Sequence, residues 1–502
     1  MTSSAPPSVP LKLPRYSTIV AIFILIEVTG IFEQVMVYVA IPTLMGVFSI
    51  DAAQVSWAIT VFLLVGAATA AVAGRLGDLY GRKKMLIILM VISAIGSIIS
   101  LAFGTFEGIL VGRALQGTSA AIFPLLVGIA REVVPAPRVP VLVSITTGTA
   151  IIGGALSGLL AGILLDLGDW RLMFLASAIL AVVALIGAAL VLPLSTVVPD
   201  AHSGRLDILG AIVFAPAVAA ILYGVNTSRA VGWGNPLVLG LVIGGAALFA
   251  FWIVWELKIK NPMFNLRLFR NPALVLTAVA TATVGLGIFA ATALMRELLL
   301  QGPAEAQVGL GLSPTEAGLW GLIGGVIGFV ISPFGGKIAS KFGAKVTTGI
   351  GLVVSLIGFF GLAIVDSLWI AIAATVIISV GTALVLAGLP NLVVEAVPPH
   401  NTGEAVGLVY GVGRTLFAAI GTAIVGMLLA SSVEEGTTHP TLGAWYLVLG
   451  VVVVLTVLSL VATLMVKRIV PMDKRGDVIE AVAEAQELAT EDAATPSAAR
   501  VH

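Results

Sequence analysis

Apolar residues occur along this chain in long uninterrupted runs. A helix rises about 1.5 Å per residue, so a run of about 20 apolar residues can cross the roughly 30 Å hydrocarbon layer of a membrane. Runs such as VVVVLTVLSLVATLMV at 451–466 do not alternate in polarity, which argues against the strands of a membrane β-barrel. The pattern predicts fourteen spanning helices, over 17–41, 54–73, 85–103, 108–130, 139–164, 172–193, 207–228, 236–257, 273–300, 314–335, 346–365, 368–392, 403–431 and 442–466.

Lys and Arg lie mostly on one side of these helices. Short cytoplasmic connections of membrane proteins collect positive charge. If the N-terminus is cytoplasmic, the opposite side holds only Arg171, Arg229 and Arg296. We therefore predict that both termini are cytoplasmic and that the chain lies in the cytoplasmic (inner) membrane. The first run is about 25 residues long, against about 7 to 15 in a signal peptide, so we expect it to be a retained helix.

Two of the predicted cytoplasmic connections repeat each other. GRLGDLYGRKK at 74–84 recurs as GKIASKFGAKV at 336–346, with Gly81 matching Gly343. Eight predicted helices separate the copies, and removing the pair at 207–257 leaves two halves of six helices each. Such repeats are typical of secondary transporters, whose halves move about a site near the middle of the membrane.

The repeat also predicts how the chain is divided. We expect a cytoplasmic segment over 1–16, a six-helix bundle over 17–193, two additional helices over 207–257, a second six-helix bundle over 273–468 and a polar cytoplasmic tail over 472–502. The expected fold class is an all-α polytopic membrane protein with two pseudo-symmetric six-helix bundles and two extra central helices.

Composition restricts the chemistry that the chain can perform. Of its 502 residues 59% are hydrophobic and 10% are charged, whereas a soluble surface needs roughly 25% charged residues. The 26 basic residues are balanced by 26 acidic ones, so we expect no nucleic-acid partner. There is no Cys, and the four His are far apart, so we expect no metal site. Without a phosphate-binding loop or a nucleophile triad, we expect no enzyme activity and no cofactor, and an ion gradient as the energy source.

Three segments resemble motifs of the major facilitator superfamily. The loop at 74–84 resembles its GxLaDxxGRK motif, and RALQGTSAA at 113–121 resembles a motif of its fourth helix. FEQVMVYVAIP at 32–42 resembles the first-helix motif of its fourteen-helix drug:proton antiporter branch, with Glu33 in place of Asp and Tyr38 in place of Asn. The positions that match the loop motif are Gly74, Asp78, Gly81, Arg82 and Lys83. The resemblance implies the major facilitator fold and a transport function.

The helix-five motif of that branch is altered in this chain. The usual pattern is gxxxGPxxGG, and the matching stretch is TAIIGGALSG at 149–158. Gly153 and Gly158 keep the pattern, Gly154 replaces the Pro, and Ser157 replaces a Gly. Because the family links this motif to exporters, the change leaves import open.

Four charged residues are predicted to lie inside helices: Glu27, Glu33, Arg113 and Arg414. Burying a charged residue in lipid costs free energy unless the residue is paired or hydrated, so each of the four is a candidate functional residue. Glu33 and Arg113 lie about 13 Å and 8 Å from the outer ends of their helices, which is within a turn of the same depth. Burial favours a neutral carboxyl group and a guanidinium favours a charged one, so we expect Glu33 to exchange a proton as the halves move. The alternative is a permanent ion pair that joins the first and fourth helices.

The remaining polar candidates are assigned from their positions. Glu27 is expected to be a second protonatable group or, alternatively, to fasten the first helix to a hydroxyl group. Gln34, Tyr38, Gln116 and Arg414 are expected to line a cavity, with packing of Arg414 on backbone carbonyls as the alternative.

The loop motif is expected to act at the membrane surface. Arg82 and Lys83 should hold the loop in the cytoplasm near anionic lipid. The resemblance implies that Asp78 engages the start of the helix at 403–431, where PPHNTGE at 398–404 favours a helix N-terminus that attracts an anion. A local cap is the alternative for Asp78.

Together these features predict a secondary active transporter. We expect proton-coupled efflux of lipophilic or amphipathic compounds by a monomer, with substrate, protons and membrane lipid as partners. An uptake permease for a small organic solute and a carrier of lipid or envelope precursor are alternatives. A non-transporting receptor or scaffold is disfavoured, because inert helices have no use for buried charges.

Overall fold

The computed structural model describes residues 15–134, 139–193, 207–259, 262, 266–365, 367–397, 405–435 and 437–466, without the side chains of some helical positions, Asp78 among them. Most of the predicted segment 1–16 and the predicted tail 472–502 lie outside these ranges. The elements are α1 (Tyr16–Phe48), α2 (Ala52–Tyr80), α3 (Arg82–Phe103), α4 (Phe106–Gln116), η1 (Gly117–Ala121), α5 (Ile122–Val133), α6 (Val139–Asp166), α7 (Arg171–Val191), α8 (Ile208–Val231), α9 (Pro236–Lys258), η4 (Leu266–Arg270), α10 (Pro272–Val284), η5 (Gly285–Phe289), α11 (Ala290–Gln301), α12 (Pro314–Phe342), α13 (Ala344–Ala363), α14 (Leu368–Glu395), η7 (Val406–Gly413), α16 (Arg414–Leu429) and α17 (Leu442–Met465).

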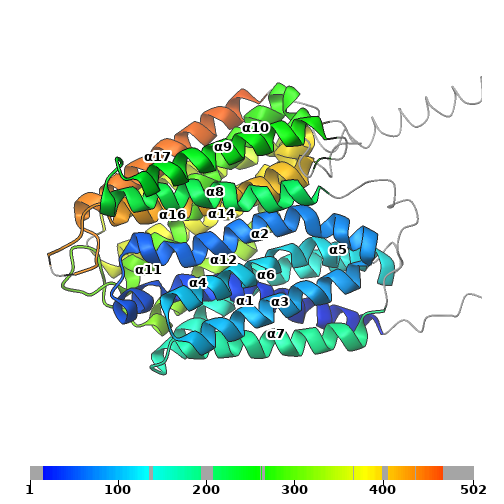
Figure 1. Ribbon diagram of the computed structural model, residues 1–502, viewed down its shortest axis with the longest axis horizontal. Coiled ribbons are helices and arrows are strands. Elements are labelled where there is room, and N and C mark those ends of the chain that lie inside the picture. Colours follow the sequence, from blue (N-terminus) through cyan, green and yellow to red (C-terminus); the bar gives the residue numbers. More distant parts are fainter. Residues whose placement is uncertain are drawn as a thin grey trace, which may run out of the picture.

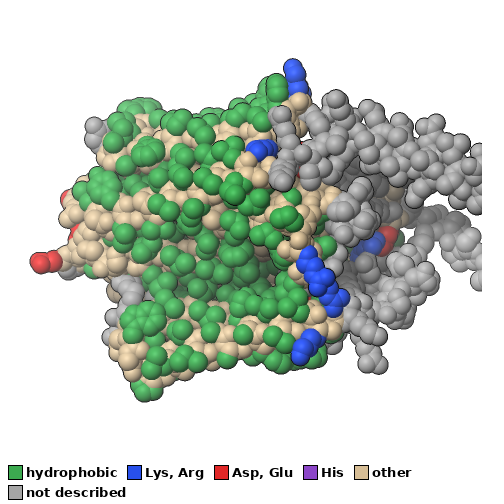
Figure 2. Space-filling view, turned by 90° about the horizontal axis from the view of Figure 1, so that it is seen from above, with side chains coloured by type: hydrophobic (Ala, Val, Ile, Leu, Met, Phe, Trp, Pro, Cys, Tyr) green, Lys and Arg blue, Asp and Glu red, His purple; other side chains and the backbone are tan. Residues whose placement is uncertain are grey.

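The predicted all-α fold of a membrane protein is confirmed. Among the described residues, twelve helices are long and apolar enough to cross a membrane, and α6 and α8 add shorter apolar stretches at Ile152–Asp166 and Ile212–Val225. Three of the predicted helices contain a local change of helix type: α4 continues through η1 into α5, α10 continues through η5 into α11, and η7 leads into α16. Figure 2 shows an apolar surface along the molecule, with Lys and Arg gathered at one end.

The first helix is longer than predicted. The apolar run predicts an end near residue 41, whereas α1 continues through Pro42 to Phe48. A proline removes one hydrogen bond from a helix, and surrounding helices in a membrane protein can compensate for that loss. Glu33 therefore lies further from the end of its helix than the sequence suggested.

The two ends of the molecule are distinguished by their connections. At the Gly81 end, α1 begins, α2 meets α3 at Gly81, α12 meets α13 at Gly343, and α17 ends. At the opposite end, called the Gly104 end, α3 meets α4 and α6 meets α7. Figure 1 shows the helices running side by side between these ends, with α1, α3 and α7 towards the bottom and α9, α10 and α17 at the top. We call α1 to α7 the first bundle and α10 to α17 the second bundle.

The two copies of the loop motif have the same local structure. Gly81 and Gly343 have φ angles of 94° and 91°, which L-amino acids with a side chain rarely adopt. Lys83 donates to the carbonyl oxygens of Ala189, at 2.8 Å, and Leu192, at the end of α7. Lys345, at the equivalent position of the second copy, donates at 3.1 Å to Val466, at the end of α17. In both halves a lysine thus binds the negative end of the last helix of its bundle.

The bundles contact each other through α2 on α16 and through α6 on α12. The additional pair forms a hairpin in which α8 packs on α2 and α16, and α9 packs on α8. Trp57 of α2 and Tyr223 of α8 make an edge-to-face contact with ring centroids 5.9 Å apart. The hairpin therefore lies beside the junction of the bundles and not within either of them (Figure 1).

Close packing of α3 on α4 generates a first prediction. A Cβ atom on Gly112 would overlap the hydroxyl group of Ser100 and the backbone oxygen of Gly96, whereas a Cβ atom on Gly240 in α9 would meet no atom within 4 Å. Gly112→Ala should therefore lower the free energy of unfolding by about 2 kcal/mol, a typical cost of overpacking. Gly240→Ala should leave stability unchanged or slightly higher, because Ala favours the helix. Thermal unfolding in detergent tests this, and equal melting temperatures would contradict the close approach.

Candidate functional site

Arg113 is a fully buried arginine near the middle of the first bundle. Its Nε donates to the carbonyl oxygen of Ala58 at 3.0 Å, and its Nη1 donates to the carbonyl oxygen of Glu33 at 2.6 Å and to Oε1 of Gln116 at 2.9 Å. The guanidinium carbon lies 4.1 Å from the ring centroid of Phe62. Arg113 thus connects α4 with α1 and α2.

The carboxylate of Glu33 points away from Arg113 and into the bundle. The hydroxyl group of Ser93 in α3 donates to Oε2 at 2.6 Å, and that of Ser177 in α7 lies 3.5 Å from Oε1. Glu33 is 1% exposed. The structure brings Glu33 and Arg113 together as the sequence suggested, but through the backbone oxygen of Glu33. The ion pair that we considered as an alternative is replaced by hydroxyl groups.

Gln116 belongs to this buried network. Its amide nitrogen donates to the hydroxyl groups of Ser97 at 2.8 Å and Ser177 at 3.3 Å. It is fully buried, so it does not line a cavity as we expected from its position on the fourth helix. The rotation of the helix turns Gln116 into the interior of the first bundle.

The other candidates of the first helix lie at several depths. Tyr38 packs against the main hydrophobic core and lies within electrostatic range of both Arg113 and Arg414. Gln34 is partly exposed, and Glu27 is 7% exposed. No hydrogen bond or ion pair within the described residues involves Glu27.

Arg414 is the first residue of α16, immediately after the π-helical segment η7. Its guanidinium carbon lies 5.5 Å from the ring centroid of Phe289 in η5 and 5.4 Å from that of Tyr410 in η7. It is partly exposed, and its buried Nε has no hydrogen-bond partner in the described structure. Packing on backbone carbonyls, the alternative that we considered, is therefore absent from the described contacts of Arg414.

The loop motif is held by contacts within the first bundle. Arg82 donates to Glu132 at 2.8 Å and to the carbonyl oxygen of Gly128 at 3.2 Å. Lys83 binds the end of α7, as described above. The side chain of Asp78 and residues 398–404 lie outside the described residues, so the contact expected between them stays a prediction.

The helix-five motif lies where three helices meet. Cβ atoms on Gly153 and Gly154 would make ordinary contacts with Ile31 of α1, and one on Gly158 would contact Val35 and Val39. Ser157 is buried. On the α12 side, a Cβ atom on Gly318 would lie 3.0 Å from the carbonyl oxygen of Gly158. The motif therefore brings α6 into close contact with α1 and with the second bundle.

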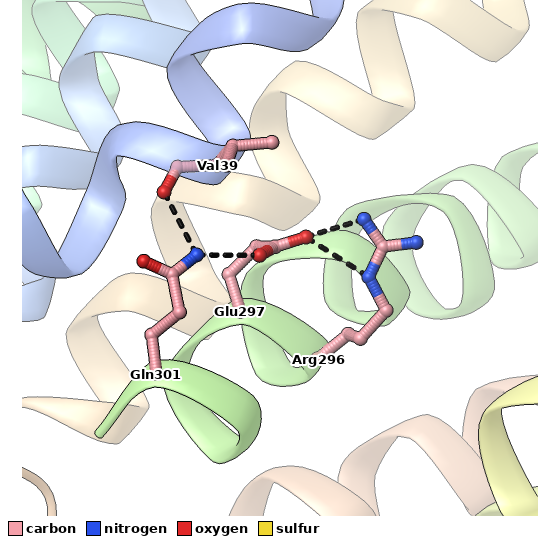
Figure 3. Close-up of polar contacts among 4 residues, drawn as sticks. All are labelled: Val39, Arg296, Glu297 and Gln301. Atoms are coloured by element: carbon pink, nitrogen blue, oxygen red, sulfur yellow. Dashed lines mark hydrogen bonds and ion pairs between the residues drawn. The ribbon is translucent and has the colours of Figure 1, made fainter. Parts of the chain in front are cut away.

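A buried carboxylate that sequence reasoning missed lies in α11. Glu297 is fully buried, and its Oε1 accepts from Nε of Arg296 at 2.9 Å and also from Nη2 (Figure 3). Gln301 donates to Oε2 of Glu297 at 2.7 Å and to the carbonyl oxygen of Val39 in α1 at 2.9 Å. The charge pattern of the sequence instead assigns Arg296 to the connections on the outer side. The spacing of four between Glu297 and Gln301 within an apolar run was the signal that could have identified this cluster.

The bond from Gln301 to Val39 joins equivalent positions of the two halves. These residues are 262 apart, the same separation as Gly81 and Gly343. Two more hydrogen bonds join the bundles within the described residues: Thr60 to the carbonyl oxygen of Ala419, and the amide of Thr315 to Asp166. All three lie in the half of the molecule nearer the Gly104 end.

Close glycine contacts show the same asymmetry. Gly162 approaches Pro314, and Gly426 approaches Ser56, both at the Gly104 end. Towards the Gly81 end, Cβ atoms on Gly336 of α12 and Gly407 of η7 would meet no atom within 4 Å. The described contacts therefore close the molecule at the Gly104 end.

Comparisons with known proteins agree with this architecture. The Major Facilitator Superfamily model matches residues 23–302 and 273–491. The MFS-type transporter YhcA of Bacillus subtilis is 25% identical over 308 residues, which cover 61% of this chain and only 56% of YhcA. The tetracenomycin C resistance and export protein of Streptomyces glaucescens is 25% identical over 415 residues, 80% of this chain and 74% of that protein.

The crystal structure of a D-xylose–proton symporter has a similar fold. The superposition of the two structures has a TM-score of 0.63 at 18% sequence identity, and it covers 91% of this chain and 98% of the symporter. At this identity the likeness concerns the fold alone. Because the family model matches nearly the whole spanning region, the chain belongs to the major facilitator superfamily, as a membrane protein of two six-helix bundles with an additional helix pair.

Proposed function

We propose that this protein is a secondary active transporter that exports lipophilic or amphipathic compounds across the cytoplasmic membrane in exchange for protons. The observation that carries this proposal is the buried carboxylate of Glu33, which is bonded to hydroxyl groups beside Arg113 inside a membrane-spanning bundle. The relative named as a resistance and export protein supports the direction of transport. We further propose that the transporter is a monomer and that both termini are cytoplasmic, which places the Lys and Arg of the Gly81 end at the cytoplasmic surface (Figure 2).

The hydroxyl partners of Glu33 suit a group that changes its protonation state. A serine hydroxyl can donate to a carboxylate and can also accept from a protonated carboxyl group. Ser93 and Ser177 can therefore bond both forms of Glu33 without rearrangement of the helices. An ion pair would bond only the charged form, so the observed arrangement favours a proton carrier over a fixed structural link.

Arg113 links the protonation of the Glu33 carboxyl group to the movement of the helices. Its Nη1 holds the backbone of α1 at Glu33, while its Nε holds α2 at Ala58. A shift of α1 relative to α4 would change the distance between the guanidinium and the carboxylate together with the access of water. Because the charge of Arg113 favours the ionised carboxylate, loading and release of the proton would follow the conformation.

In the proposed orientation the structure is closed on the outer side. The three hydrogen bonds that join the bundles within the described part of the chain lie towards the Gly104 end, which would be the outer end. Export would require these contacts to separate so that a compound bound from the cytoplasm leaves on the outer side. The bond from Gln301 to Val39, positioned by Glu297 and Arg296, is a latch in this cycle.

A substitution at Glu33 tests proton coupling. Glu33→Gln keeps the size of the side chain and its capacity for hydrogen bonds, but it cannot exchange a proton. In proteoliposomes with the cytoplasmic side of the protein facing outward, uptake of dye driven by a pH gradient should therefore fall at least about tenfold. Glu107→Gln provides the control, because Glu107 is exposed in the first turn of α4. The experiment is fluorescence measurement in proteoliposomes with and without a protonophore. Unchanged gradient-driven flux in Glu33→Gln would exclude the coupling role.

A second substitution tests the latch. The chain has no cysteine, so Ser56→Cys places a single thiol at a fully buried position between α2 and α16. Gln301→Leu removes the bond to Val39, and the rate of maleimide labelling of Cys at position 56 should rise several-fold because the outer side opens more often.

Gln307→Leu is the matched control, since the side chain of Gln307 bonds within the second bundle, to the amide of Leu442. It should leave the labelling rate unchanged. Equal labelling rates in the Gln301 and Gln307 variants would show that the bond to Val39 does not hold the outer side closed.

A further inference from the structure

The guanidinium group of Arg414 differs from those of Arg113, Arg296 and Arg82 in the lack of a protein acceptor. Arg113 donates to three oxygen atoms, Arg296 to Glu297, and Arg82 to Glu132 and Gly128. Within the described residues Arg414 makes no hydrogen bond and no ion pair. Its Nε is nevertheless buried, so water does not reach this atom freely.

The surroundings of Arg414 satisfy its charge only in part. The rings of Phe289 and Tyr410 lie at cation–π distance and attract the guanidinium through their faces. Aromatic faces do not accept the N–H groups that point outward in the plane of the guanidinium. An arginine at membrane depth without acceptors is costly, and such residues are usually kept for a function.

Arg414 lies beside two segments of the second bundle whose backbone is π-helical. η5 and η7 are both π-helical, and π-helical turns are frequent at functional sites. Gly285 of η5 allows a close approach to α16, because a Cβ atom there would lie 3.2 Å from the carbonyl oxygen of Arg414. The guanidinium of Arg414 therefore lies beside an aromatic ring of each π-helical segment.

Arg414 also lies near the first bundle. Tyr38 of α1 is within electrostatic range of both Arg414 and Arg113. The carboxylate of Glu33 is bonded to α3 and α7, on the inner side of the first bundle, and does not pair with Arg414. No carboxylate among the described residues pairs with Arg414, so its guanidinium remains an unpaired cation.

We propose that Arg414 binds an anionic group of the transported compound, so that the substrates are amphipathic carboxylates and not cations. This inference rests on the transport function proposed above and names its substrate class. The planar guanidinium fork matches a carboxylate in a bidentate arrangement. Phe289, Tyr410 and Tyr38 would contact the apolar part of the compound.

The test uses two radiolabelled probes that share a ring and a chain but differ in charge: 4-phenylbutanoate and 4-phenylbutyltrimethylammonium. Binding to the purified full-length protein in detergent is measured by scintillation proximity. The wild type should bind the carboxylate in preference to the ammonium compound. Arg414→Met should weaken carboxylate binding by about tenfold or more, the loss expected for a charge-assisted hydrogen bond. Arg414→Lys should be intermediate, because it keeps the charge but not the fork.

Arg171→Met is the matched control. Arg171 also stacks on an aromatic ring, that of Trp170 at 5.0 Å, but lies at the Gly104 end, away from the junction of η5 and η7. This variant should bind 4-phenylbutanoate as the wild type does. Melting temperatures of all variants establish that they are folded. A purely structural role of Arg414 would change the melting temperature but not the preference between the probes.

Two outcomes would overturn the inference: folded Arg414→Met binding 4-phenylbutanoate as tightly as the wild type, or the wild type binding the ammonium probe equally well. Liposome assays separate this result from the function proposed above. Gradient-driven export of the ammonium probe that needs Glu33 and is unaffected by Arg414→Met would contradict the inference and support the transporter. Arg414-dependent binding of the carboxylate without transport of either probe would support the inference and contradict the transporter.

Discussion

The structure depends on how it accommodates charge inside an apolar bundle. Arg113 has no exposed surface, yet its donors reach the backbone of two neighbouring helices and the side chain of Gln116. Because an unsatisfied charge at this depth would be costly, these bonds fix the rotation and the depth of α1, α2 and α4 relative to one another. The same bonds leave the carboxylate of Glu33 to the serine hydroxyl groups of α3 and α7.

Polar groups elsewhere follow the same constraint with different results. Glu297 is buried at the contact between the bundles and is fully bonded to Arg296 and Gln301, which turns a charged pair into a contact between the halves. Arg414 is left with aromatic rings alone. The fold thus holds three charged groups in three different environments. Glu33 is bonded to hydroxyl groups, Glu297 supports a contact between the bundles, and Arg414 has no hydrogen-bond acceptor among the described residues.

In the proposed transport cycle, these groups would act through the hydrogen bonds between the bundles. Those in the described residues lie near the Gly104 end, whereas the repeated loops at Gly81 and Gly343 lie at the other end and are tied by lysines to the last helix of each bundle. Each bundle is therefore internally fastened. The described hydrogen bonds between the bundles are few and lie towards one end, although α2 also packs on α16 and α6 on α12. This distribution suits two bodies that move relative to each other.

The spanning segments, the repeat and the family can be read from the amino-acid sequence alone, because hydrophobic length, charge bias and motif spacing are local properties of the chain. The sequence also places Glu33 and Arg113 at a similar depth. Which atoms meet is visible only in the folded molecule. The tertiary structure bonded Arg113 to the backbone of Glu33, turned Gln116 inward, carried α1 past Pro42 and placed Glu297 between the halves. The physical reason is that the rotation of an apolar helix is set by close packing with its neighbours, and a run that is apolar on all sides does not encode that rotation.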